Sequence, residues 1–272
     1  MRSLLLAAIF LAVGVSSSFA EYDPSGIDQI LHQYVREGRV DYQGLRKDAR
    51  ARQTLDQYLR GARDVSRVEY NNWSMLSKKA FWLNAYNALC LQQVLEKYPC
   101  EAQTLFRFAL FPRYSPQNVE GFFSKKKHRV LDEFFSLDLI QRMVLLIRLH
   151  DITLLFGASP AARGGPRLFS AVYEGPHLKE QLEGQIKNTL SRPECFRVDR
   201  ADHAVFLSEF FQHFGEDFIP LMDRTFDKPT TKEKERAVLE FLMDYLSKED
   251  KEFLKDPTVK VHYEKFDWAL NE

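Results

Sequence analysis

The hydrophobic pattern of the chain centres on residues 80–98. Read at 100° per residue, this stretch has a wide apolar face. The opposite side of its first half is apolar as well, and a polar side appears only from Gln92 onward. The wide apolar face holds Leu83, Leu91, Val94 and Leu95. The opposite side holds Trp82, Tyr86 and Leu89. A helix that is apolar all round is enclosed by the rest of the protein, so the pattern predicts a central buried helix.

The remaining pattern predicts amphipathic helices with a few short strands. One-sided apolar spacing predicts helices over 26–36, 44–61, 136–149, 176–190, 208–214 and 230–246. Short β-rich runs predict strands at 152–156, 195–198 and 259–263. No repeat, linker or change in composition divides residues 21–272. We therefore predict a single globular domain of the α+β class, predominantly α-helical, with a small β-sheet and the central buried helix.

Residues 1–20 have the three zones of a secretory signal peptide. Arg2 gives a positive start, residues 4–13 form an apolar run too short to span a bilayer, and Ser18 to Ala20 is a small-x-small cleavage site. We therefore expect a mature chain that begins near Glu21 and is secreted or periplasmic. No later segment is long and apolar enough to be transmembrane.

The charges of the chain are balanced, with 38 Lys and Arg against 38 Asp and Glu. A nucleic-acid-binding protein would favour a basic stripe, so we expect no nucleic acid partner. The one basic run, residues 125–129, is interpreted as a solvated loop before the next element.

The chain has three cysteines, Cys90, Cys100 and Cys195. Cys90 lies in the predicted central helix and is expected to be a buried small hydrophobe. Cys100 and Cys195 both flank turns, which makes them the preferred pair for a disulfide in an oxidising compartment. No two cysteines have the spacing of zinc ligands, and we predict neither a metal site nor a cofactor.

Two asparagines of the central helix are the first candidates for a site. Asn84 and Asn87 are three residues apart, so they share a side of the helix. A buried amide without a hydrogen-bond partner costs roughly 1–3 kcal/mol, so both side chains need partners. Either they tie neighbouring loops to the helix, or they line a ligand pocket with Tyr86 between them.

Two loops are further candidates. Residues 157–167 hold three glycines, two prolines and two arginines, so backbone N–H groups, Ser159, Arg163 and Arg167 could bind an anion there. The loop lacks the ending of a Walker motif and the glycine spacing of a dinucleotide site, and a structural loop is the alternative. Residues 99–135 form a long aromatic loop that either packs on the core or covers a pocket.

The central stretch, AFWLNAYNAL followed by EKYP, resembles the signature of the family called domain of unknown function 547. Further stretches similar to the family follow in the same order: REGRVDYQGL, SLDLI at 136–140, FGASPAARGGPRL at 156–168, FLSEFF at 206–211 and FDWALN at 266–271. The resemblance covers nearly all of residues 21–272. Because the family's activity is not established, the resemblance implies a fold relation more than a function.

The resemblance also implies what this chain lacks. Relatives often carry an acid–histidine pair where this chain has Gln141 and Arg142, and cysteines where it has Phe156 and Gly165. A cysteine nucleophile with a nearby base is therefore replaced at each position.

We accordingly predict a non-catalytic ligand- or partner-binding or scaffold domain that binds a small anion, a peptide or a protein. Its candidate ligand-binding residues are Asn84, Tyr86, Asn87, Ser159, Arg163 and Arg167. The alternative is a hydrolase or transferase acting on an extracytoplasmic peptide or polymer.

Overall fold

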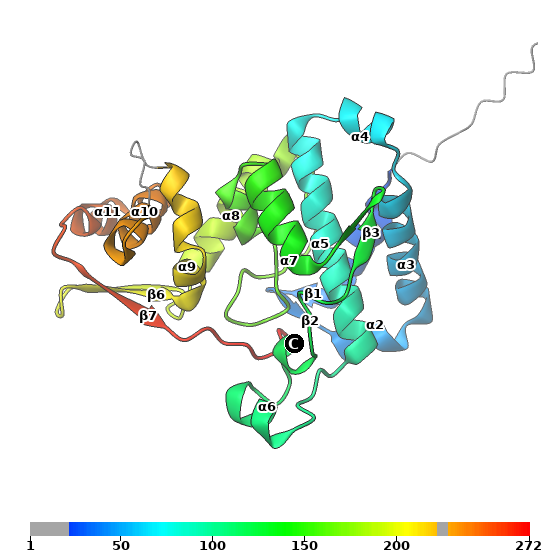
Figure 1. Ribbon diagram of the computed structural model, residues 1–272, viewed down its shortest axis with the longest axis horizontal. Helices are drawn as coiled ribbons and strands as arrows, with labels where there is room; N and C mark the ends of the chain where they lie inside the picture. Colours follow the sequence, from blue (N-terminus) through cyan, green and yellow to red (C-terminus); the bar gives the residue numbers. More distant parts are fainter. Residues whose placement is uncertain (1–21, 222–227) are drawn as a thin grey trace, which may run out of the picture.

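The computed structural model describes residues 22–221 and 228–272 (Figure 1). The predicted signal peptide lies outside the described residues. Within them, no helix combines the length and the hydropathy that crossing a membrane requires.

The first half of the chain is helical apart from two hairpins. Its helices are α1 (Ser25–Tyr34), α2 (Tyr42–Lys47), α3 (Ala49–Asp64), α4 (Arg67–Asn72), α5 (Met75–Lys97), α6 (Leu105–Leu110) and the short η1 (Pro116–Asn118). The hairpins pair β1 (Val35–Arg36) with β2 (Arg39–Val40), and β3 (His128–Val130) with β4 (Glu133–Phe135). In Figure 1 these helices gather around α5, while α6 stands away from them.

The second half adds further helices and a three-stranded sheet. Its helices are α7 (Leu137–Leu139), the π-helix η2 (Ile140–Arg148), η3 (Ile152–Phe156), η4 (Gly175–His177), α8 (Leu178–Leu190), α9 (Glu209–His213), η5 (Gly215–Leu221), α10 (Thr231–Met243) and α11 (Lys248–Leu254). The sheet has the order β5 (Phe196–Asp199), β6 (Ala204–Ser208) and β7 (Lys260–Glu264), with β5 antiparallel and β7 parallel to β6. The predicted α+β class, predominantly α-helical with a small sheet, is confirmed.

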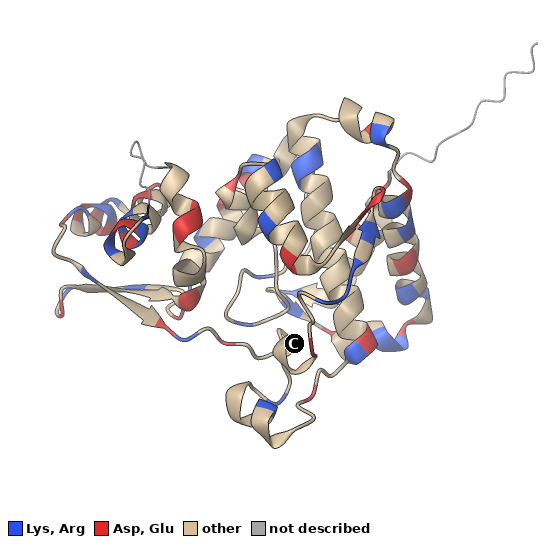
Figure 2. Cartoon of the chain, in the orientation of Figure 1, with Lys and Arg blue, Asp and Glu red and all other residues tan. Residues whose placement is uncertain are grey.

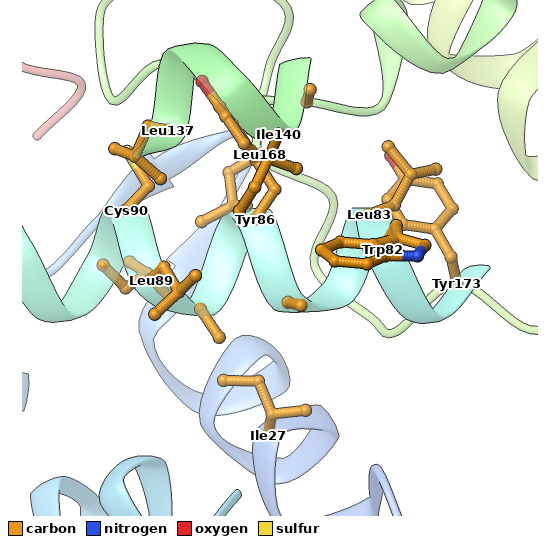
Figure 3. Packing of buried hydrophobic residues seen from close by; sticks show 14 of the residues in the cluster. Ile27, Trp82, Leu83, Tyr86, Leu89, Cys90, Leu137, Ile140, Leu168 and Tyr173 are labelled. Atoms are coloured by element: carbon orange, nitrogen blue, oxygen red, sulfur yellow. The ribbon is translucent and has the colours of Figure 1, made fainter. Parts of the chain in front are cut away.

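Helix α5 is the centre of the fold, as its pattern predicts. Its first turn is capped by Ser74, whose hydroxyl accepts a hydrogen bond from the Ser77 N–H at 3.0 Å. Every residue from Ala80 to Leu91 is buried. Figure 3 shows why: Tyr86 rises from α5 toward Leu137 and Ile140, whereas Ile27 of α1 lies on the other side of the helix. The central helix therefore packs on several elements at once.

Residues 152–156 form a 3-10 helix, so the predicted strand is wrong there. The carboxylate of Asp151 accepts hydrogen bonds from the N–H and the hydroxyl of Thr153, at 3.0 and 2.5 Å. Such local bonds favour a turn over an extended strand. The short helix also joins two hydrophobic clusters, because Leu154 belongs to the one around α5 and Leu155 to the one between α8, α10 and the sheet.

The C-terminal segment runs back across the molecule after β7. The Gly164 N–H donates to Asp267 O at 2.8 Å, and the Leu270 N–H donates to Tyr114 O at 2.9 Å. The chain ends beside β2, where the Val40 N–H donates to Asn271 O at 2.8 Å (Figure 1). This segment is thereby fixed between the 157–167 loop and the aromatic loop.

Candidate functional site

Asn84 and Asn87 each hold a loop through two hydrogen bonds, one donated by the amide nitrogen and one accepted by the amide oxygen. Asn84 donates to Tyr173 O and accepts from the Tyr173 N–H, both at 2.8 Å. Asn87 donates to Gly157 O at 2.9 Å and accepts from the Ser159 N–H at 3.0 Å. The two side chains are 4% and 5% exposed, so these backbone groups are out of reach of water. The geometry is that of our first interpretation, in which the amides tie loops to α5.

The 157–167 loop is held by a buried arginine from outside it. Arg192, 5% exposed, donates to Arg163 O at 3.0 Å and to Gly165 O at 2.8 Å. The Arg163 guanidinium in turn donates to Leu270 O at 3.2 Å. The Arg167 side chain lies against Gly38. The backbone carbonyl of Arg167 accepts a hydrogen bond from the Gln185 side chain at 2.7 Å. The two loop arginines therefore support neighbouring backbone, and the structure does not bring them together around a common anion site.

An aromatic cleft of about 740 Å³ lies on one side of this loop. Its walls come from α5, the aromatic loop, the start of η2, the 158–166 backbone, α9 and the C-terminal segment. Of the six candidate ligand-binding residues, Tyr86 lines the cleft; Ser159 lies between its lining residues Ala158 and Pro160. The Ser159 hydroxyl itself is buried and has no hydrogen-bond partner among the described residues.

Partly exposed rings form one wall of the aromatic cleft. Trp268 lies between Phe266 and Phe123, with ring centroids 4.4 and 6.0 Å away. Phe210 and Phe214 of the α9 region line the cleft as well. Flat rings of this kind offer a large contact area at a small loss of side-chain entropy.

Free polar groups line the same cleft. Gln117, Gln141 and Gln212 line the cleft, and none of their side-chain amides has a hydrogen-bond partner within residues 22–221 and 228–272. The same holds for the Tyr86 hydroxyl. Burial first, and then Cys90 and Asp138, raise the pKa of Tyr86 well above its usual value. The hydroxyl therefore stays protonated and is free to donate a hydrogen bond.

A histidine and a carboxylate share the cleft with them. Burial raises the pKa of Asp138, although Arg142 and His213 oppose the shift. Burial, followed by the charge of Arg142, lowers the pKa of His213. The Arg142 guanidinium lies 2.8 Å from Nε2 of His213, and a guanidinium only donates, so Nε2 accepts and Nδ1 carries the hydrogen. His213 is thus a neutral donor in the lining that also holds Asp138.

The three cysteines lie apart from the cleft lining and are all free and buried. The predicted disulfide between Cys100 and Cys195 is therefore absent from the structure. Cys100 packs in the cluster around α5, whereas Cys195 lies by Arg192, 3.9 Å from Gly164 O. Burial raises the pKa of Cys100 to about 12 and that of Cys195 to about 11, so both thiols stay protonated at neutral pH.

Most residues of the aromatic cleft escape sequence reasoning because they come from segments far apart. Two signals in the sequence do point to it: the candidate Tyr86 lines the cleft, and so do Phe122 and Phe123 of the aromatic 99–135 loop. The positions where relatives carry an acid–histidine pair diverge here. Gln141, at the first of these positions, lines the cleft. Phe156, at a position where the resemblance implies a cysteine, is instead fully buried and stacks on Phe241 in the second hydrophobic cluster.

Comparison with known proteins places residues 70–188 in a family profile described as "Protein of unknown function, DUF547". The matched region holds α5, the aromatic loop and the 157–167 loop, whereas α9 and the C-terminal wall of the cleft lie beyond it. No curated protein and no solved structure matches the chain.

Proposed function

Taking the chain as a member of the DUF547 family, whose description assigns it no function, we propose that it is a peptide-binding domain without catalysis of its own. The observation that carries the proposal is the aromatic cleft, whose lining combines free hydrogen-bonding groups with partly exposed rings. Its volume of about 740 Å³ is within the range of small-molecule and short-peptide sites.

A peptide suits both kinds of surface. The rings of Trp268, Phe266 and Phe123 favour an apolar or aromatic side chain. Amide side chains such as Gln141 and Gln212 both donate and accept, which is what the C=O and N–H of a bound backbone require. Cations and carboxylates are both present at the cleft, as Arg107 and as Asp138 and Glu209, so neither sign of ligand charge dominates.

The residues at the cleft support binding more than hydrolysis. His213 is held by Arg142, and the thiols that would serve as nucleophiles are buried elsewhere. The alternative is a hydrolase or transferase acting on an extracytoplasmic peptide or polymer. The following experiment separates this alternative from binding without catalysis.

Selection of a random-peptide library on the immobilised protein tests the proposal. We expect enriched peptides to carry aromatic or large aliphatic side chains and to remain intact. Ser124→Trp fills the cleft from an exposed position and should abolish capture, whereas Ser191→Trp, exposed on the far end of α8, should leave it unchanged.

Four results would contradict the proposal. Failure to enrich any peptide, or capture that Ser124→Trp leaves intact, would remove the cleft as a peptide site. Cleavage of the captured peptide would favour the hydrolase alternative. Capture of oligosaccharides on a glycan array, with no peptide bound, would assign the same rings to sugar stacking.

We also propose that the protein works outside the cytoplasm as one domain. The signal-peptide pattern of residues 1–20 supports export. Support for one domain comes from the described residues, in which the short η3 helix belongs to both hydrophobic clusters. We expect exported material to begin at Glu21 or within a few residues of it, and Edman sequencing that finds Met1 at its amino terminus would contradict a cleaved signal peptide.

A further inference from the structure

A second, smaller hollow lies between α3 and β3, and we call it the arginine groove. It measures about 280 Å³ and is lined by Arg60, Arg63 and Arg129 together with Asp56 and His128. Arg60 and Arg63 are three residues apart on α3, so they share a face of that helix. The β3–β4 turn lies against this face, where the Leu131 N–H donates to Ala62 O at 3.2 Å, and Arg129 thereby joins the pair.

The arginine groove shares no lining residue with the aromatic cleft. Ala85 and Leu89 form its floor on α5, whereas Tyr86 of the same helix faces the cleft. In Figure 1 the groove's elements, α3 and β3, lie on the side of the molecule opposite the three-stranded sheet. The two sites are therefore open to independent tests.

Positive charge is in excess at the arginine groove. Arg63 is paired with Asp64 at 2.8 and 3.1 Å, and Asp56 accepts a hydrogen bond from Gln92 at 2.9 Å. Arg60 and Arg129 form no ion pair with the described residues. Their charges nevertheless reach Asp64, because the Arg63 hydrogen bond and then Arg129 and Arg60 lower the pKa of its carboxyl.

The residues of the basic run 125–129 have two different environments. Lys125 and Lys126 are paired with Glu120 and Glu96, which accounts for them as solvated ion pairs. Arg129 instead turns to the α3 arginines, and Figure 2 shows basic residues along α3 and on the adjoining β3 strand. The chain as a whole is charge-balanced, so this local excess comes from the fold.

A buried imidazole is the second observation that points to a ligand. His128 lines the groove and is 8% exposed, and its Nε2 has no hydrogen-bond partner in the described part of the chain. An unpaired polar atom in such a place costs free energy, which a ligand oxygen would relieve.

We propose that the arginine groove binds a tetrahedral oxyanion, the phosphate or sulfate ester group of a larger molecule. The planar guanidinium groups of Arg60 and Arg129 donate paired N–H groups to the anion's oxygens, a geometry that fits phosphate and sulfate. An oxygen of the anion would also supply the hydrogen-bond partner that Nε2 of His128 lacks among the described residues. A phosphate monoester carries more charge than a sulfate ester at neutral pH and is expected to bind more tightly.

Titration with phenyl phosphate and with phenyl sulfate, at constant ionic strength in chloride, tests the proposal. The readout is the set of Nε–H signals of the arginines and the ring signals of His128 in NMR spectra. We expect saturable shifts at Arg60, Arg129 and His128. Arg60→Gln combined with Arg129→Gln should weaken binding roughly tenfold or more, because two charge-assisted contacts are lost. Arg52→Gln, exposed on the same helix but outside the groove, should leave it unchanged.

The two ligands separate the sources of the anion. Saturation with phenyl phosphate alone identifies a phosphate ester, and saturation with both identifies a site for either ester. Shifts that grow linearly without saturation, or that the double variant retains, would show general charge screening and overturn the proposal. The urea melt of the double variant confirms that it is folded before the titration is read.

Discussion

Replacing Asn84 by leucine is expected to lower the free energy of unfolding by roughly 2–5 kcal/mol. The side chains have similar volumes, so the loss comes from hydrogen bonds alone. Asn84→Leu leaves the N–H and the C=O of Tyr173 without partners in a buried place, and each such group costs roughly 1–3 kcal/mol. Asn87→Leu should act alike through Gly157 and Ser159. For a chain of this length the melting temperature falls by roughly 5–15 °C.

Two matched variants calibrate this prediction. Gln93→Leu removes a single hydrogen bond, to Phe122 O at 3.0 Å, and should cost about half as much. Gln53→Leu, exposed on α3, should change little. Urea melts in which both asparagine variants match the parent would mean that the amides do not hold the Tyr173 and Gly157 loops.

Acidification from about pH 7 to about pH 4 is expected to remove roughly 3 kcal/mol of stability through His128 alone. Burial first, and then the charge of Lys126, lower the pKa of His128 from 6.5 to about 4 in the folded protein. The unfolded chain takes up its proton near the ordinary value, so it gains the proton first as the pH falls. The contribution is therefore fully present above about pH 6.5 and is lost on the way down to pH 4.

The measurement compares the pH dependence of urea melts for the parent and for His128→Leu, in buffers free of phosphate and sulfate. The variant lacks this titration, so its stability should fall less steeply over the same range. His262→Leu, an exposed histidine on β7, should follow the parent. Parallel curves for the parent and His128→Leu would contradict the burial of the imidazole.

Features of the fold that depend on a few neighbouring residues are predictable from the sequence. Thr230 and Glu233 form the capping box that their spacing indicates, and Ser136 and Ser208 cap the helices that follow them. The central helix is equally clear, because residues 80–91 leave no polar face for solvent.

Deviations from regular geometry are not visible in the same pattern. Residues 140–148 form a π-helix where the periodicity indicates an ordinary α-helix, and the two differ too little in spacing for a short stretch to separate them. At 152–156 the apolar run is compatible with a strand, and the hydrogen bonds of Asp151 decide otherwise.

The candidate site shows the same limit at longer range. The glycines and arginines of the 157–167 loop are compatible with an anion site. In the structure this loop is instead held by Arg192, which follows α8 and donates to Arg163 O and Gly165 O. The cleft joins Tyr86 to Trp268 across most of the chain, and no spacing in the sequence relates the two. The environment of the 157–167 loop and the composition of the cleft both depend on tertiary contacts, which a single sequence does not display.

The most direct test of the peptide-binding proposal is isothermal titration calorimetry of a library-selected peptide against Trp268→Ala. Trp268 lies at the centre of the aromatic wall, so its loss should raise the Kd by roughly 10- to 100-fold. Phe134→Ala, a matched loss of an exposed ring outside the cleft, should leave the Kd at the parent value. Equal affinity of the parent and Trp268→Ala would contradict a peptide site in the aromatic cleft.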